Sequence, residues 1–146
     1  MQISSRFTLA VHILACIAVI KNIKITSNFL AGSTNINPVI VRKLLGQLKN
    51  AKLVDVARGT GGATLAKPAD EISFLDIYRA VECVEHGELF HFHEKPNDKC
   101  PIGRNIHEVL DGRLEQVQQA MERELASISL QDVQEEIIQC IDKEKS

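Results

Sequence analysis

The amino-acid sequence predicts a mainly α-helical fold with one small β-hairpin and a long helix towards the C-terminus. Three patterns lead to this prediction. Apolar residues recur at three- and four-residue spacing in several segments, as they do in amphipathic helices. A glycine-rich turn at residues 58–62 separates two short segments that are typical of strands. A regular apolar stripe extends over residues 106–128, and the 146 residues suit one domain with such a helix appended.

The first predicted helix covers residues 4–20. Its apolar residues recur every three or four positions, so they form one broad stripe that packs into the core. Ser4 or Ser5 can cap its N-terminus. His12 is interpreted as a packed or surface histidine, and Cys16 as an inert thiol in an apolar helix.

Two shorter helices are expected to follow. The first covers residues 26–31, and Gly32 is expected to end it by adopting a left-handed conformation. The second begins at Asn37 and Pro38, because asparagine can cap a helix and proline suits the first helical position. It runs to about Asn50.

This third helix is predicted to have one core face and one exposed face. The core face consists of Val41, Leu44, Leu45 and Leu48. The exposed face holds Val39, Arg42, Lys43, Gly46 and Asn50, with Ile40 and Gln47 at its edges. Apolar β-branched residues beside basic ones suit a DNA major groove, which offers thymine methyl groups and phosphates. Alternatively, Val39 and Ile40 pack against the preceding helix.

A β-hairpin is predicted after the third helix, with strands at residues 53–57 and 63–66 around the turn at 58–62. A glycine-rich loop could also hold a nucleotide phosphate, but no helix follows and the glycine spacing matches no phosphate-binding motif. The order of helix, helix, turn, helix and hairpin is that of a winged helix-turn-helix. In that fold the third helix enters the major groove and the hairpin, or wing, contacts the backbone or minor groove.

A further short helix is expected to start with a capping box at residues 73–76. Its apolar face consists of Phe74, Ile77, Tyr78 and Val81. A polar loop over residues 82–99 then leads to the long helix, which opens at Cys100 and Pro101. Ser129 with Asp132 can cap a final helix.

The long helix carries an apolar stripe with a near eleven-residue period. Such a stripe needs a partner helix, so the sequence predicts dimerisation through it. The residues of the stripe are Ile106, Leu110, Leu114, Val117, Met121, Leu125 and Ile128, of which the first six are predicted to form the dimer contact. The chain is thus expected to divide into a winged helix-turn-helix DNA-binding domain (1–82), a sensor-type loop (83–100) and the dimerisation and C-terminal helices (101–146).

Positive and negative charges are distributed unevenly. Residues 1–67 carry nine Lys or Arg residues and a single acid, Asp55, whereas residues 68–146 carry eight basic and eighteen acidic residues. This split favours a polyanion-binding module joined to a second module with another role. Uneven solvation of a single domain is the alternative.

The composition, with 45% hydrophobic and 25% charged residues, is typical of a folded globular protein. The N-terminus lacks the exit site of a secretory signal peptide, and its apolar segment is too short to span a membrane. The sequence therefore predicts a cytoplasmic protein with no membrane partner. The cysteines contain no C-x-x-C pair and are expected to be free thiols: Cys16, Cys83, Cys100 and Cys140.

Three segments resemble a known family. They are residues 3–10, 58–62 and 71–81, and the last is similar to the family's ITLxDIxRAVE segment. On these segments the chain resembles the Rrf2 family of bacterial winged-helix regulators over nearly its whole length. Residues 91–94 and 100–106 are similar to the YwnA-like branch of this family.

The resemblance implies a homodimer joined by the long helix, with each recognition helix in a major groove of double-stranded DNA and Arg58 reaching towards the minor groove. The operator is then expected to be two-fold symmetric. The residues expected to contact DNA are Ser5, Arg6, Asn37, Val39, Ile40, Arg42, Lys43, Arg58, Gly59 and Thr60.

Family members that bind an iron–sulfur cluster carry three closely spaced cysteines before the long helix. Here only Cys100 stands at the position of the last one, and Cys83 lies seventeen residues upstream. Gly103 stands where a ligand histidine can occur. The sequence therefore predicts no cluster, no bound metal and no cofactor.

Cys100 is predicted instead to be a thiol sensor, because a helix N-terminus favours the thiolate. A small-molecule effector is one alternative. A metal- or cluster-dependent sensor is another, since four of the five histidines and two cysteines lie within residues 83–107.

The predicted function is sequence-specific DNA binding by a transcriptional regulator that acts as a repressor, and no enzymatic activity is expected. A hydrolase would need Cys100 as nucleophile and His91, His93 or His107 as base. The sequence supplies no oxyanion hole or substrate pocket for it, and the basic N-terminal half would have no role. A further alternative is an interaction adaptor that keeps the fold without binding DNA.

Overall fold

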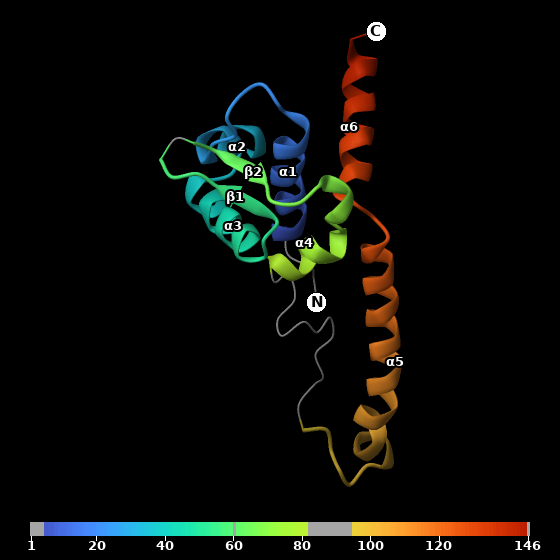
Figure 1. The fold of residues 1–146 in the computed structure, drawn as a ribbon. Coiled ribbons are helices and arrows are strands. Elements are labelled where there is room, and N and C mark those ends of the chain that lie inside the picture. The colour runs from blue at the N-terminus through green and yellow to red at the C-terminus, as the bar shows by residue number, and fades with distance from the viewer. Residues whose placement is uncertain (1–4, 60, 82–94, 146) are drawn as a thin grey trace.

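The computed structural model describes residues 5–59, 61–81 and 95–145. This part of the chain contains six α-helices, a short 3-10 helix and a two-stranded antiparallel sheet, which confirms the predicted mainly α-helical fold with a hairpin. Figure 1 shows that α1 to α4 and the hairpin form a body, with α5 and α6 along one side of it. Helix α5 extends away from this body, whereas α6 lies beside α1.

Helix α1 (Arg6–Val19) is the central helix of the core, with seven buried residues. Of the two predicted caps, Ser4 lies outside the described residues, and the Ser5 prediction is wrong because the Ser5 side chain accepts no capping hydrogen bond. Its backbone is already helical (φ −60°, ψ −11°), and a capping side chain needs an extended backbone to reach back to the first turn. The hydroxyl of Thr8 instead donates to the Ser5 carbonyl oxygen at 3.1 Å.

Helix α2 (Ser27–Thr34) begins at a cap formed by Thr26, whose hydroxyl oxygen accepts from the Phe29 N–H at 3.1 Å. The predicted end at Gly32 is wrong, since the helix continues to Thr34. The left-handed residue that ends it is Asn35, with φ 57°. Asparagine tolerates this conformation better than most side chains, so the helix can run past the glycine.

Helix α3 (Pro38–Asn50) begins and ends where the sequence predicts. The Asn37 Oδ1 atom accepts from the Val39 N–H at 2.8 Å, and Pro38 occupies the first helical position. All four predicted core residues are buried: Val41, Leu44, Leu45 and Leu48.

The hairpin consists of β1 (Val54–Val56) and β2 (Ala63–Leu65), paired so that Asp55 lies opposite Thr64. The Ala57 N–H donates to the Gly62 carbonyl oxygen at 3.0 Å and closes the turn. The Ala63 N–H donates to the Ile25 carbonyl oxygen at 2.8 Å, which anchors the hairpin to the segment before α2.

After the 3-10 helix η1 (Ala69–Glu71), helix α4 (Phe74–Ala80) starts with the predicted capping box. The Ser73 hydroxyl accepts from the Asp76 N–H at 3.1 Å, and the Asp76 carboxylate accepts from the Ser73 N–H at 3.0 Å. The Phe74 ring packs edge-on against Phe7 of α1, with centroids 5.5 Å apart.

Helices α5 (Pro101–Ala126) and α6 (Leu130–Glu144) complete the fold. Helix α5 is shorter than its predicted stripe, because it ends before Ile128. The predicted capping box of Ser129 and Asp132 starts α6. The predicted loop at 83–100 and the first domain boundary fall largely on residues 82–94, which lie outside the described residues.

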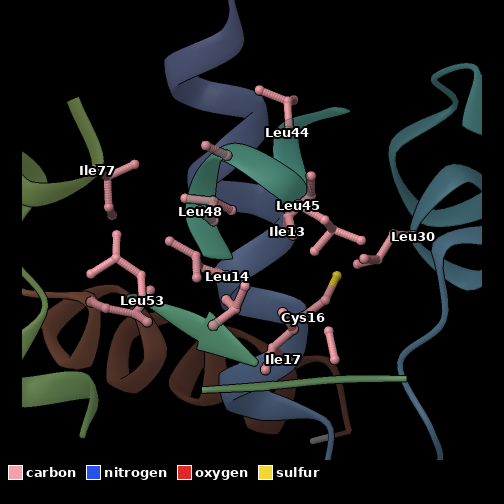
Figure 2. Close-up of a cluster of buried hydrophobic side chains, with 14 of the residues drawn as sticks. Ile13, Leu14, Cys16, Ile17, Leu30, Leu44, Leu45, Leu48, Leu53 and Ile77 are labelled. Atoms are coloured by element: carbon pink, nitrogen blue, oxygen red, sulfur yellow. The ribbon is translucent and has the colours of Figure 1, made fainter. Parts of the chain in front are cut away.

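One apolar core joins these elements. Figure 2 shows residues of α1, α3 and α4 packed together, with Leu30 of α2 and Leu53 before β1 at its edges. Leu130 of α6 is fully buried in the same cluster. The core therefore holds the exposed face of α3 at a fixed position on the body.

No helix in the described segments is long and apolar enough to cross a membrane.

Candidate nucleic-acid interface

The exposed face of α3 combines apolar and cationic side chains. Val39 is 63% exposed and Ile40 is 46% exposed, so neither is buried against the preceding helix. Arg42 and Lys43 are exposed in the next turn. Two β-branched side chains left in water are unfavourable, at roughly 25 cal/mol per Å² of apolar surface, unless a partner covers them.

The cap at Asn37 positions the first turn of this face. The Asn37 side-chain Oδ1 atom already accepts from the Val39 N–H, so that atom has a structural role in α3. Pro38 lacks an N–H and places no unsatisfied donor there. The cap thus fixes the direction in which Val39 projects.

The hairpin turn lies next to α3. A cavity of about 440 Å³ separates them, lined on the α3 side by Arg42, Gly46 and Lys49, and on the hairpin side by Val56 and Gly59. Arg58 is exposed, and Gly59 has a φ of +70° that favours glycine. Thr60 lies outside the described residues. The structure therefore places one predicted contact residue of the hairpin, Gly59, beside the basic face of α3, and Arg58 precedes it in the chain.

Lys49 is an exposed cation on this surface that is not among the predicted DNA contacts. It follows Arg42 by seven residues, a spacing that returns to the same face of a helix. That spacing was the signal available in the sequence. In the first 67 residues the single acid is Asp55, so few negative charges offset these cations.

Ser5 and Arg6 lie on a different part of the body from the hairpin turn. They begin α1, and the neighbouring Phe7 packs against Phe74 at the start of α4. The start of α1, where these two predicted contact residues stand in the chain, is therefore close to α4.

The predicted dimerisation stripe divides into two parts. Met121 and Leu125 pack against the core of their own chain. Ile106, Leu110 and Leu114 are only partly covered, and Val117 is 50% exposed.

Two apolar residues of α5 outside the predicted stripe are even more exposed. Ile102 is 73% exposed and Val109 is 62% exposed. With Val117 they are spaced by seven and eight residues, which the sequence pattern would have revealed. Helix α5 has no buried residue, so its apolar surface is wider than predicted.

Cys100 is the N-cap residue of α5 and its side chain is partly exposed. The backbone N–H of Gly103, and to a lesser extent that of Ile102, stabilises the thiolate and lowers the pKa of Cys100 below that of an ordinary thiol. A Cβ atom on Gly103 would collide with the backbone of Asn97, so the turn before α5 packs closely on its first residues.

An iron site is not supported by the residues that the structure describes. Within residues 5–59, 61–81 and 95–145, no group of three or more His, Cys, Asp or Glu side chains could hold a metal ion. Cys83, His86, His91 and His93 lie outside these ranges. The Cys100 and His107 side chains therefore do not form such a site by themselves.

Comparison with known proteins gives three kinds of match. Residues 3–136 match the model of the Rrf2 family, which is described as an iron-dependent transcriptional regulator. YwnA of Bacillus subtilis (strain 168), whose name assigns it to the HTH-type transcriptional regulators, is 47% identical over 90% of this chain and 96% of its own. YwgB of the same organism, named in the same way, is 28% identical over 83% and 76% of the two chains.

Solved structures share the fold. A crystal structure described as that of a DNA-binding protein is 41% identical, covers 88% of this chain and 98% of its own, and superposes with a TM-score of 0.70. CymR, the global cysteine regulator of B. subtilis, is 22% identical over 92% and 97% of the two chains, with a TM-score of 0.67. At that identity the second likeness supports the fold alone.

Proposed function

Since the chain belongs to the Rrf2 family of transcriptional regulators, we propose that it is a repressor that binds a two-fold symmetric site in double-stranded DNA as a homodimer. The observation that carries this proposal is the exposed start of α3. Val39 and Ile40 are apolar and open to water, and Arg42 and Lys43 follow them on the same side. A major groove offers partners to both kinds of side chain.

The hairpin acts as the wing. Arg58 at its exposed turn reaches the minor groove or the adjacent phosphates, while Arg42 and Lys49 line the hollow between the wing and α3. Phosphate contacts of this kind orient the protein on the duplex, and the first turn of α3 reads bases.

The dimer forms through α5. Ile102, Val109 and Val117 are at least half exposed on a helix that extends beyond the body, and a second copy of the same helix would cover them. A symmetric dimer presents two recognition helices about one DNA turn, or a multiple of it, apart. Operator symmetry follows from that arrangement.

Cys100 is the proposed sensor. Its thiol is partly exposed and has a lowered pKa, so oxidation or alkylation would occur there under mild conditions. Modification adds bulk or charge at the start of α5, and DNA binding should fall. A small molecule that binds the protein is the second candidate for the effector. We place the protein in the cytoplasm, where bacterial operators lie.

The test is footprinting on promoter DNA from the source organism, combined with affinity measurements at several salt concentrations. Protection of a symmetric site, with an affinity that falls steeply as salt rises, supports the proposal. An unprotected promoter, or an affinity for DNA that does not change with salt concentration, would contradict the proposal. Either result would favour an interaction adaptor that keeps the fold without binding DNA.

A further inference from the structure

Three polar side chains meet between α1 and α2, none of them among the proposed DNA contacts. His12 and Cys16 are four residues apart on α1, so they project from the same side of this helix. The His12 Nε2 atom lies 2.9 Å from the Ser33 Oγ atom of α2, and the Cys16 Sγ atom lies 3.5 Å from the same oxygen. One hydroxyl therefore joins a nitrogen donor and a sulfur donor.

The cluster of His12, Cys16 and Ser33 is exposed to water at the imidazole and the hydroxyl, and is buried at the sulfur. His12 and Ser33 are exposed, whereas Cys16 is only 9% exposed. Figure 2 shows the Cys16 sulfur pointing towards Leu30 of α2, an apolar neighbour. An ion can reach the cluster at the imidazole and would be partly shielded from water at the sulfur.

We propose that His12 and Cys16 bind one soft monovalent metal ion of the Cu⁺ class, with the Ser33 hydroxyl as a weak third donor. Thiolate is the side-chain group that Cu⁺ selects, and imidazole is a second good donor for copper. A d¹⁰ ion of this kind accepts two or three donors, which is the number that the cluster supplies. Zn²⁺ in proteins almost always has four, and the described residues offer no third strong donor here.

The net charge of the bound site favours a monovalent ion over a divalent one. Cu⁺ and one thiolate form a neutral pair, which can be buried beside Leu30 at little electrostatic penalty. A divalent ion would leave one uncompensated positive charge. Helices α1 and α2 contain no acidic residue, so neither of the two helices supplies a carboxylate to neutralise it.

The binding step is a ligand exchange without redox change. The S–H bond of Cys16 breaks, the S–Cu bond forms and the proton leaves to water, while copper stays monovalent. The imidazole nitrogen gives up its contact with the Ser33 hydroxyl and donates its lone pair to the ion. The ion then links α1 directly to α2.

The test uses the full-length chain with Cys83, Cys100 and Cys140 replaced by serine, so that Cys16 is its one thiol. This protein is titrated with Cu⁺ without oxygen against bathocuproine disulfonate, a coloured Cu⁺ chelator. It should retain one ion per chain. Adding Cys16→Ser should abolish retention, and adding His12→Gln should weaken it by about tenfold or more, because one of two strong donors is lost.

His107→Gln is the matched control, since it removes a histidine of α5 and should leave the affinity unchanged. X-ray absorption at the copper edge should detect one sulfur and one imidazole nitrogen. No retained copper, or equal retention after His12→Gln, would overturn the proposal. Ser33→Ala and His12→Gln would then lower thermal stability alone, as expected of a purely structural contact.

Any effect of the ion on operator affinity rests on the proposed function, because α2 is the helix that precedes the recognition helix. The copper titration contains no DNA. Failure of the metal site and failure of the DNA-binding proposal are therefore distinguishable.

Discussion

The backbone N–H of Leu130 donates to the carbonyl oxygen of Ile72 over 2.7 Å. Beside it, the Phe74 N–H donates to the Ile128 carbonyl oxygen at 2.8 Å. These two bonds join the start of α4 to the start of α6, at the point where α5 ends. This bridge is a direct connection between α5 and the body that carries α3, so a change along α5 is expected to act on the body here.

Replacing Leu130 tests how much this junction contributes to stability. Leu130 has no exposed surface, and Leu130→Ala should lower the free energy of unfolding by about 2–5 kcal/mol through lost burial and a residual cavity. Urea denaturation measures the change. Ile138→Ala, on the same helix at a residue that is 39% exposed, is the control and should lower it much less. Equal losses would mean that Leu130 is not a core residue.

Arg42→Ala and Lys43→Ala should each weaken operator binding. A lost phosphate contact reduces the salt dependence of log affinity by about one unit, whereas a lost base contact changes the preferred sequence and costs about 1–3 kcal/mol. Fluorescence anisotropy at several salt concentrations separates the two. Lys143→Ala on α6 removes an equal charge far along the chain and should have little effect. A similar loss for all three would indicate non-specific attraction.

Operator affinity should depend on both the positive charge and the backbone conformation of the wing. Arg58→Ala is expected to reduce affinity by removing a cation from the exposed turn. Gly62→Ala should do so by distortion, since Gly62 has a φ of +81° and a Cβ there would come within 3.1 Å of the Ile25 backbone nitrogen. Thr64→Ala, on the exposed side of β2, is the control in the same anisotropy assay. Unchanged binding in both wing variants would mean that the wing does not touch DNA.

Leu114→Glu and Val117→Glu should convert the dimer to monomers and abolish operator binding, because a carboxylate would be buried in the proposed helix contact. Sedimentation velocity reports the oligomeric state. Gln116→Glu adds the same charge at an exposed neighbouring position and should leave the dimer intact. Met121→Glu should also lose the dimer, but with reduced stability, since Met121 packs against the core. An unaltered dimer in Leu114→Glu would move the interface elsewhere.

Cys100 should be alkylated faster than Cys140 at neutral pH. The Gly103 and Ile102 N–H groups lower the pKa of Cys100, so its thiolate forms at lower pH and its alkylation rate should rise with a midpoint below that of an ordinary thiol. Mass spectrometry after iodoacetamide treatment measures both rates. Gly103→Ala would displace the turn at Asn97, so it should lower the alkylation rate of Cys100 and leave that of Cys140 unchanged.

The sensor role needs a second measurement. Operator affinity of the wild type should fall after mild oxidant treatment, and that of Cys100→Ser should not. Equal responses in the two proteins would remove Cys100 as the sensor.

Local sequence patterns were sufficient for most of the fold. Apolar spacing identified the core face of α3, and the capping boxes that start at Ser73 and Ser129 located α4 and α6. These features depend on residues within one or two turns of each other, so the sequence contains all of their determinants. Where two local signals competed, the prediction was wrong: Gly32 could end α2, but Asn35 does so.

The sequence by itself determined which residues share a face of a helix, including the basic face of α3 and the apolar stripe of α5. Only the tertiary structure decided what covers those faces. It packs Met121 and Leu125 against their own core, leaves Ile102 open, and brings Ser33 to the side chains of His12 and Cys16. The reason is physical: periodicity follows from the geometry of one helix, whereas a contact between helices depends on how the whole chain packs.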